Sequence, residues 1–254
     1  SLNDFRVVLD CANGAAYKVG PVVLWELGAE VHSMGIEPNG RNINDGCGSL
    51  FPEKLAERVK EVRADVGIAL DGDADRVVLV DENGRVLDGD MLLALCARDM
   101  KSRGILRGDG VVATVMSNLA LERNLDQQGL HLRRTQVGDR YVVEAMREHG
   151  YNLGGEQSGH LIFLDHSRTG DGLRSALQVL SVMARTGQKL SELTADYEKF
   201  PQALLGVRVA EKKPIESLPT LQSAIADVEA QLGDRGRVLI RYSGTERLAR
   251  VMVE

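Results

Sequence analysis

Three aspartates, Asp71, Asp73 and Asp75, alternate along one short run of the chain. Apolar stretches at residues 66–70 and 77–80 flank this run and predict two strands with no room for a helix between them. We therefore expect a tight loop on which the three carboxylates converge. Like charges at such close range require a cation, and carboxylate oxygens suit hard divalent ions. The run predicts a Mg²⁺ site with coordination positions open to a phosphate oxygen.

Three other interpretations of this run remain open at this point. The aspartates match the first, third and fifth positions of a calcium-binding EF-hand loop, and Glu82 falls on the twelfth, but Arg76 occupies the sixth position, where glycine is needed. An Asp-x-Asp phosphatase would use the first aspartate as its nucleophile, although the usual partner residues of that class are not evident. The simplest alternative is an acidic turn exposed to water.

Length, composition and charge set the general class of protein. The chain has 254 residues, 43% of them hydrophobic, which suffices for packed cores. Its net charge of −6 and its lack of a long basic run argue against a nucleic-acid partner. Cys11, Cys47 and Cys96 are few and widely spaced, which favours reduced thiols. With neither a signal sequence nor a long apolar segment evident, we expect a soluble cytoplasmic protein that does not enter a membrane.

Strand and helix patterns alternate along most of the chain, which predicts an α/β fold with parallel strands. Residues 1–85 carry the aspartate run and form the first expected domain. Residues 86–200 repeat the alternation and form the second. From residue 201 to residue 254 the pattern changes to strand, helix and strand. We predict two three-layer α/β/α domains with mixed sheets, followed by a small C-terminal α+β domain.

A second segment whose residue types could bind a ligand or take part in a reaction is the glycine-rich stretch at residues 154–160. Glycines let a backbone approach a ligand closely, and Glu156, Ser158 and His160 would point the same way if the segment were extended. Such side chains can bind sugar hydroxyls, and an imidazole can also transfer a proton. A polar turn with a packed histidine explains the same residues equally well.

A third segment, residues 241–247, contains Arg241, Ser243, Gly244 and Thr245. An arginine, two hydroxyls and a glycine turn are suited to a phosphate dianion, because arginine binds it bidentately and hydroxyls and amides supply further donors. Arg250 follows shortly after. A surface turn flanked by solvated arginines is the alternative.

A fourth and weaker candidate is Gly138-Asp139-Arg140. Asp139 is positioned to cap a helix that runs to His149, and Arg140 could reach an anion at the N-terminus of that helix. Ordinary helix capping accounts for the pattern without a ligand.

Taken in order, these segments resemble the α-D-phosphohexomutase family. Its members have an Asp-Gly-Asp-x-Asp-Arg metal loop, a Gly-Glu-x-Ser-Gly sugar loop and an Arg-x-Ser-Gly/Asn-Thr phosphate loop near the C-terminus. The likeness extends from about Arg6 to Glu254. Segments 137–142 and 154–160 look most like the members that act on a phosphorylated hexosamine.

The resemblance implies a phosphoenzyme mutase of four domains whose first domain carries a phosphoserine. One Mg²⁺ per chain would be held by the three aspartates and would offset charge that develops during phosphoryl transfer. Arg76 would lie beside the transferring phosphate, and His160 is a candidate proton shuttle. Glu156, Ser158 and Arg140 would bind the sugar phosphate. The phosphate that is not transferred would be anchored by Arg241, Ser243, Gly244, Thr245 and Arg250.

The chain also departs from the family pattern. It begins where the family's second domain begins, so a missing N-terminal domain with the serine nucleophile is expected as a partner, and the last domain is expected to be cut at its C-terminal end. We expect no mutase turnover from this polypeptide alone. Tyr242 and Arg247 stand where the hexosamine-specific members usually have proline.

Two rival functions remain. One is a mutase of the same family with a different sugar, such as glucose or mannose phosphate, and the other is a non-catalytic module that binds a phosphosugar. The hexosamine resemblance implies a phosphoprotein of amino-sugar metabolism that supplies UDP-N-acetylglucosamine for cell-wall precursors. The oligomeric state is left open.

Overall fold

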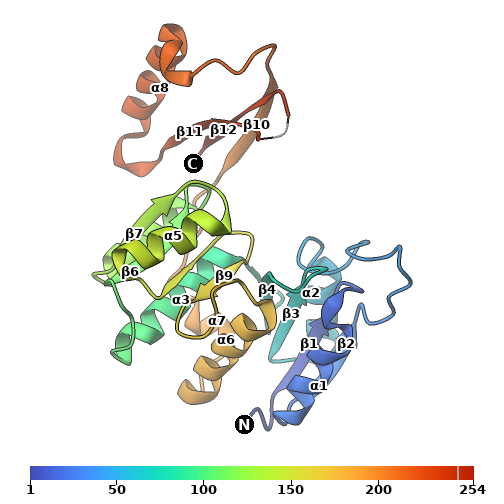
Figure 1. Cartoon of the computed structure of the whole chain (residues 1–254). Helices are drawn as coiled ribbons and strands as arrows, with labels where there is room; N and C mark the ends of the chain where they lie inside the picture. Colours follow the sequence, from blue (N-terminus) through green and yellow to red (C-terminus); the bar gives the residue numbers. More distant parts are fainter. Residues whose placement is uncertain (245) are drawn as a thin grey trace. The chain divides into compact units, whose positions relative to one another are not determined.

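A five-stranded mixed sheet organises the first 87 residues of the chain (Figure 1). The computed structural model describes residues 1–244 and 246–254. The strand order is β2-β1-β3-β4-β5, with β1, β2 and β3 parallel and β4 and β5 antiparallel to their neighbours. The elements are β1 (Arg6–Asp10), η1 (Ala15–Tyr17), α1 (Val19–Glu26), β2 (Glu30–Met34), α2 (Glu53–Val62), β3 (Val66–Leu70), β4 (Val77–Asp81) and β5 (Val86–Leu87).

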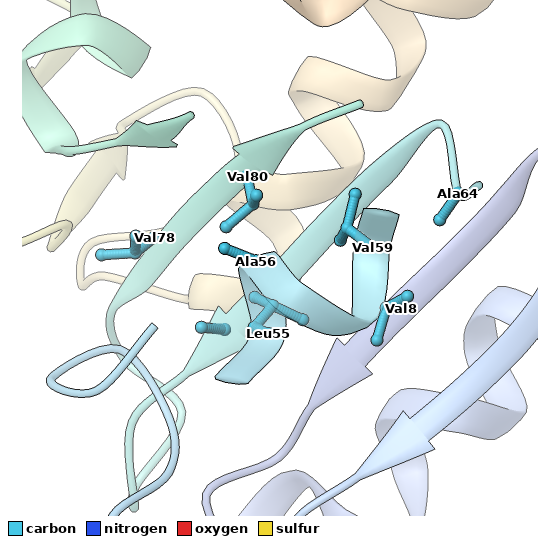
Figure 2. Packing of buried hydrophobic residues seen from close by; sticks show 8 residues of the cluster. Val8, Leu55, Ala56, Val59, Ala64, Val78 and Val80 are labelled. Atoms are coloured by element: carbon cyan, nitrogen blue, oxygen red, sulfur yellow. The ribbon is translucent and has the colours of Figure 1, made fainter. Parts of the chain in front are cut away.

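Helix α2 covers one face of this sheet. Its apolar residues recur at helical spacing, which places Leu55 and Val59 on the same side. Both belong to one buried cluster with Val8 of β1 and with Val78 and Val80 of β4 (Figure 2). Burial of each such side chain stabilises the fold by about 1.5–3 kcal/mol. This cluster holds the two strands on either side of β3, the strand that leads into the aspartate run.

The opposite face of the sheet is covered by two helices from distant parts of the sequence. Helix α1 packs Gly20 so closely on Leu9 of β1 that a Cβ at this glycine would lie 2.9 Å from a Leu9 methyl carbon. Helix α6 (Gly172–Thr186) contacts β3 and β4. The first sheet is therefore completed by a helix that begins 85 positions after the end of β5.

A four-stranded mixed sheet of order β7-β6-β8-β9 forms next, with β6, β7 and β8 parallel and β9 antiparallel to β8. Helix α5 packs on one face, and α3 contacts β6 and β8 as well as α6. The elements are α3 (Gly89–Ser102), β6 (Gly110–Thr114), α4 (Leu119–Gln127), β7 (His131–Thr135), α5 (Asp139–His149), β8 (Leu153–Gly155), β9 (Leu161–Phe163) and α7 (Leu190–Leu193).

Gly154 lets α5 approach this second sheet. The strand register places Val112, Gly154 and Ile162 side by side on one face. A Cβ at Gly154 would lie 2.7 Å from the Met146 sulfur and 3.0 Å from a Val142 methyl carbon, so a side chain here would displace the helix. The packing of α5 onto the sheet therefore depends on a residue without a side chain.

Residues 1–117 and 121–197 form one compact unit that contains both of these sheets. Residues 118–120 and 198–254 form a second unit. It contains an antiparallel sheet of order β10-β12-β11, with helix α8 against β11. Its elements are β10 (Ala203–Arg208), η2 (Ile215–Ser217), α8 (Pro219–Leu232), η3 (Gly233–Arg235), β11 (Val238–Tyr242) and β12 (Leu248–Val253). Within the described residues, no helix combines the length and apolar character needed to cross a membrane.

The predicted fold class is confirmed, since two α/β segments with mixed sheets precede a small α+β segment. The domain limits at residues 85 and 200 stay a prediction. One local expectation needs correction. Residues 154–160 do not form an extended row, because Gly154 and Gly155 belong to strand β8 and the residues after them form a turn.

The buried cluster under α2 yields a stability prediction. Leu55→Ala should lower the free energy of unfolding by about 2–5 kcal/mol, because a fully buried leucine leaves a cavity that its neighbours cannot fill. Leu50→Ala is a matched control, since Leu50 is 66% exposed, and should change stability by no more than about 0.5 kcal/mol. Urea unfolding followed by circular dichroism measures both. Equal effects of the two substitutions would contradict this account of the core.

Candidate functional site

The aspartate run forms the loop of the hairpin between β3 and β4. Leu70 and Val77 are the last paired residues before the loop, and the Ala74 amide donates to the Asp71 carbonyl at 3.1 Å. Ala74 has a φ of +63°, a left-handed conformation that closes the turn. One ligand atom from each of Asp71, Asp73 and Asp75 lies within 4.8 Å of the other two. The expected convergence of carboxylates is confirmed, and the strands that flank them are incompatible with an EF-hand.

Burial and mutual repulsion make this cluster unfavourable without a cation. Asp71 is only 9% exposed, and its pKa is raised to about 6, first by burial and then by the negative charges of Asp75 and Asp73. The amide of Arg76 opposes this shift by donating to Asp71 Oδ1 at 3.1 Å. A set of convergent carboxylates with insufficient compensating charge fits a hard divalent cation.

The Arg76 side chain lies beside the same carboxylates without a hydrogen bond to them. Its Nε is 3.9 Å from Asp71 Oδ2 and 3.8 Å from Asp75 Oδ1. This Nε is buried and has no hydrogen-bond partner among the described residues. The Arg76 side chain as a whole is 43% exposed, so it can also meet an anion that approaches the loop.

Two other loops at this edge of the sheet pack against the aspartate loop. The Ala15 amide donates to the Gly72 carbonyl at 2.8 Å. The buried carboxylate of Asp10 accepts from the amides of Ala12, at 2.9 Å, and Gly48, at 2.8 Å, which ties both loops to the end of β1. Asp10 was not among the expected site residues, although an acidic residue at the end of an apolar run is a signal present in the sequence.

The glycine-rich segment is the turn of the hairpin between β8 and β9. The Glu156 amide donates to the His160 carbonyl, and the Gly159 amide donates to the Glu156 carbonyl, both at 3.0 Å. Glu156, Ser158 and His160 therefore do not point the same way as an extended segment would require. Ser158 Oγ donates to Glu156 Oε2 at 3.3 Å, and Glu156 Oε1 accepts from the Gly138 amide at 3.0 Å.

His160 points from this turn toward the aspartate loop. Its Nδ1 lies 3.2 Å from Asp75 Oδ2, and its Nε2 accepts from the Gly170 amide at 3.1 Å. The residue is only 4% exposed. The structure thus brings together the metal loop and the sugar loop, which the sequence analysis treated as separate motifs.

Backbone contacts through glycines fix these loops against each other. A Cβ at Gly159 would lie 2.1 Å from the Val77 carbonyl oxygen, and one at Gly172 would lie 2.4 Å from the Arg76 carbonyl oxygen. The Gly172 amide also donates to the Ala74 carbonyl at 2.9 Å. The N-terminus of α6 therefore supports the aspartate loop directly, a role that the sequence analysis did not assign to it.

Arg140 lies on the exposed side of α5. Its Nε is 2.8 Å from Glu144 Oε1, and this carboxylate raises the pKa of the guanidinium. The expected capping role of Asp139 was wrong: Gly138 is the N-cap, and Asp139 instead accepts from the Arg140 amide at 2.7 Å. With no side-chain cap at this end, the first turn of α5 can still receive an anion.

The segment expected to bind phosphate follows β11 in the second compact unit. Arg241 and Arg250 are register partners on neighbouring strands, and the pKa of Arg241 is lowered by burial and by the charge of Arg250. Nζ of Lys212, which the sequence analysis overlooked, donates to the carbonyls of Ser243 and Gly244 at 2.6 and 3.3 Å. Thr245 lies outside the described residues. Adjacent cations beside a turn favour an anionic ligand.

Three sequence profiles of one family match consecutive parts of the chain. Residues 1–84 match "Phosphoglucomutase/phosphomannomutase, alpha/beta/alpha domain II", residues 88–200 match domain III, and residues 204–254 match the C-terminal domain. The chain belongs to the phosphoglucomutase/phosphomannomutase family. The segments expected to bind metal, sugar and phosphate lie one in each of these three matched parts, in the same order.

Curated members of the phosphoglucomutase/phosphomannomutase family are similar over the whole chain. A phosphoglucosamine mutase of Magnetococcus marinus is 62% identical over 253 residues, which are 100% of this chain and 52% of that protein. One of Nitratidesulfovibrio vulgaris is 61% identical over 254 residues, or 100% of this chain and 56% of that protein. The chain thus spans about half the length of these relatives.

Solved structures of the family share the fold. N-acetylphosphoglucosamine mutase of Aspergillus fumigatus, in complex with GlcNAc-6P and magnesium, matches 99% of this chain and 62% of its own with a TM-score of 0.77 and 26% identity. A phosphoglucomutase/phosphomannomutase family protein of Burkholderia thailandensis matches 98% of this chain and 56% of its own, also at 0.77, with 24% identity. The second likeness concerns the fold alone.

The raised pKa of Asp71 predicts a pH-dependent stability of the metal-free protein. The Asp71 carboxyl binds a proton more tightly in the folded state than in the unfolded state, where its pKa is 3.8. Its contribution to the free energy of unfolding is therefore fully present below about pH 4 and is lost as pH rises through about 6. Asp71→Asn should therefore be more stable than wild type at pH 7.5, by roughly 1–2 kcal/mol after allowance for solvent. The difference should disappear near pH 4.

Thermal unfolding in the presence of a chelator measures this difference. Asp73→Asn provides the control, because Asp73 is exposed and its removal relieves repulsion without removing a buried charge. Asp73→Asn should therefore stabilise the protein less than Asp71→Asn does. A metal-free Asp71→Asn protein that is less stable than wild type at pH 7.5 would refute the electrostatic argument.

Proposed function

We propose that this chain is the metal-binding, sugar-binding and phosphate-binding part of a phosphoglucosamine mutase, which interconverts glucosamine 6-phosphate and glucosamine 1-phosphate. The observation that carries the proposal is the packing of a three-carboxylate loop against the Glu156–His160 turn inside one compact unit. The printed names of relatives about 60% identical support the hexosamine substrate. The complete reaction belongs to the longer proteins of which the chain spans about half.

In this proposal, Asp71, Asp73 and Asp75 hold Mg²⁺. Their close oxygens and the raised pKa of Asp71 suit a hard divalent ion. When bound, Mg²⁺ supplies Lewis-acid stabilisation of phosphate charge. Arg76 adds a second positive charge at the edge of the same loop and can bind a phosphate oxygen there.

Glu156 and Ser158 are proposed to bind the sugar. The Glu156 carboxylate accepts from the Gly138 amide and from Ser158 Oγ, and these contacts hold both side chains in one orientation at the hairpin turn. A carboxylate accepts hydrogen bonds from sugar hydroxyls and from a hexosamine ammonium, whereas the serine hydroxyl can donate or accept. Arg140 is proposed to contribute a cation for the sugar phosphate at the start of α5.

The phosphate that is not transferred is proposed to bind Arg241, Ser243, Gly244, Thr245 and Arg250. Two neighbouring arginines repel each other when the site is empty, and a phosphate dianion would remove that repulsion. Because the substrate must reorient between two half-reactions, a fixed phosphate anchor suits a mutase. We also propose a place in amino-sugar metabolism in the cytoplasm, on the pathway to UDP-N-acetylglucosamine.

Calorimetric titration of the chain in Mg²⁺ with three sugar phosphates tests the assignment. Glucosamine 6-phosphate should bind more tightly than glucose 6-phosphate or mannose 6-phosphate. Glu156→Gln should reduce this preference by about tenfold, because it removes the charge that favours the amino sugar. Glu148→Gln, on the exposed face of α5, is the control. Tighter binding of glucose or mannose 6-phosphate would favour another sugar specificity within the family.

The phosphate anchor is tested separately. Arg241→Gln should weaken binding of all three sugar phosphates by at least about tenfold, since a charge-assisted hydrogen bond contributes roughly 1.5–3 kcal/mol. Arg235→Gln alters an exposed arginine in the same compact unit and should leave binding unchanged. An equal loss in both variants would indicate a general charge effect rather than an anchor.

A further inference from the structure

We propose that His160 is a positioning residue that acts through Asp75, holding this carboxylate toward the bound metal as a neutral imidazole with its proton on Nδ1. The inference rests on the proposed metal site. It assigns His160 a different task from the proton transfer to substrate that its residue type suggested.

The hydrogen bond at Nε2 determines the tautomer. The Gly170 amide can only donate, and it lies 3.1 Å from Nε2, so Nε2 must carry a lone pair and no proton. Asp139 Oδ2 is 4.0 Å from the same nitrogen, which is beyond hydrogen-bond distance. The proton of the neutral ring is therefore on Nδ1.

The proton on Nδ1 faces Asp75. Nδ1 donates to Asp75 Oδ2 across 3.2 Å and leaves the other carboxylate oxygen free of this contact. Asp75 is 34% exposed and is repelled by Asp71 and Asp73, so without a donor its side chain could rotate into solvent. A neutral donor fixes the carboxylate and leaves its negative charge available to the metal.

The surroundings of the ring favour positioning over proton transfer. His160 is 4% exposed, and a Cβ at Gly170 would lie only 2.5 Å from the ring, so the backbone of the loop before α6 lies directly on the imidazole. Both nitrogens are already engaged. A buried ring with two fixed partners has no open nitrogen for a sugar hydroxyl.

Two substitutions at one position separate these roles. The amide nitrogen of asparagine can occupy the place of Nδ1 and still donate to Asp75, whereas that of glutamine reaches instead toward the place of Nε2. His160→Gln should weaken Mn²⁺ binding by about ten- to a hundredfold, and His160→Asn should stay close to wild type. His166→Gln, an exposed histidine in the neighbouring loop, is the control. Electron paramagnetic resonance of free Mn²⁺ gives the affinities.

Nitrogen-15 NMR of histidine-labelled, metal-free protein tests the hydrogen bond independently, because it reports which ring nitrogen carries the proton. A proton on Nε2, wild-type Mn²⁺ affinity in His160→Gln, or equal losses in folded His160→Gln and His160→Asn would each overturn the inference. Absence of Mn²⁺ binding by wild type would instead remove the proposed metal site, while the NMR result would still report on the contact with Asp75.

Discussion

Electrostatic repulsion among three carboxylates is the constraint on which the candidate site depends. The hairpin between β3 and β4 holds Asp71, Asp73 and Asp75 within 4.8 Å of each other, and burial of Asp71 prevents water from screening its charge fully. A polypeptide tolerates this arrangement only where other contacts enforce it. The buried strands on either side of the loop supply that enforcement, because their core cannot form unless the loop is closed.

Close backbone contacts hold the hairpin turn of the second sheet and the start of α6 against the aspartate loop. Gly159 approaches the Val77 carbonyl and Gly172 approaches the Arg76 carbonyl at distances that no other residue type permits without displacement. These contacts place the Glu156 turn and the N-terminus of α6 on the metal loop. As a result, the residues proposed to bind metal and sugar belong to one compact unit, and backbone contacts fix the loops that carry them.

The phosphate loop presents the opposite electrostatic problem in the second unit. Arg241 and Arg250 are register partners on adjacent strands, and burial together with the charge of Arg250 lowers the pKa of Arg241. Lys212 Nζ donates to the carbonyls of Ser243 and Gly244, which holds these two residues beside its ammonium group. The chain thus keeps clustered anions in one unit and clustered cations in the other, and the ligands proposed to relieve these repulsions are a metal ion and a phosphate, respectively.

The sequence by itself determined the alternation of strands and helices, the position of the aspartate loop and the chemistry available to each motif. These features depend on local spacing: apolar runs at residues 66–70 and 77–80 leave no alternative to a tight loop, and the local pattern predicts a helix that ends at His149, as α5 does. The strand, helix and strand expected for residues 201–254 did not include β12, because Arg250 interrupts its apolar run. Only the tertiary structure decided that His160 contacts Asp75, that Gly170 fixes its tautomer and that α6 supports the metal loop. Those relations join residues between ten and about a hundred positions apart, and local periodicity contains no information about which distant backbone segments meet.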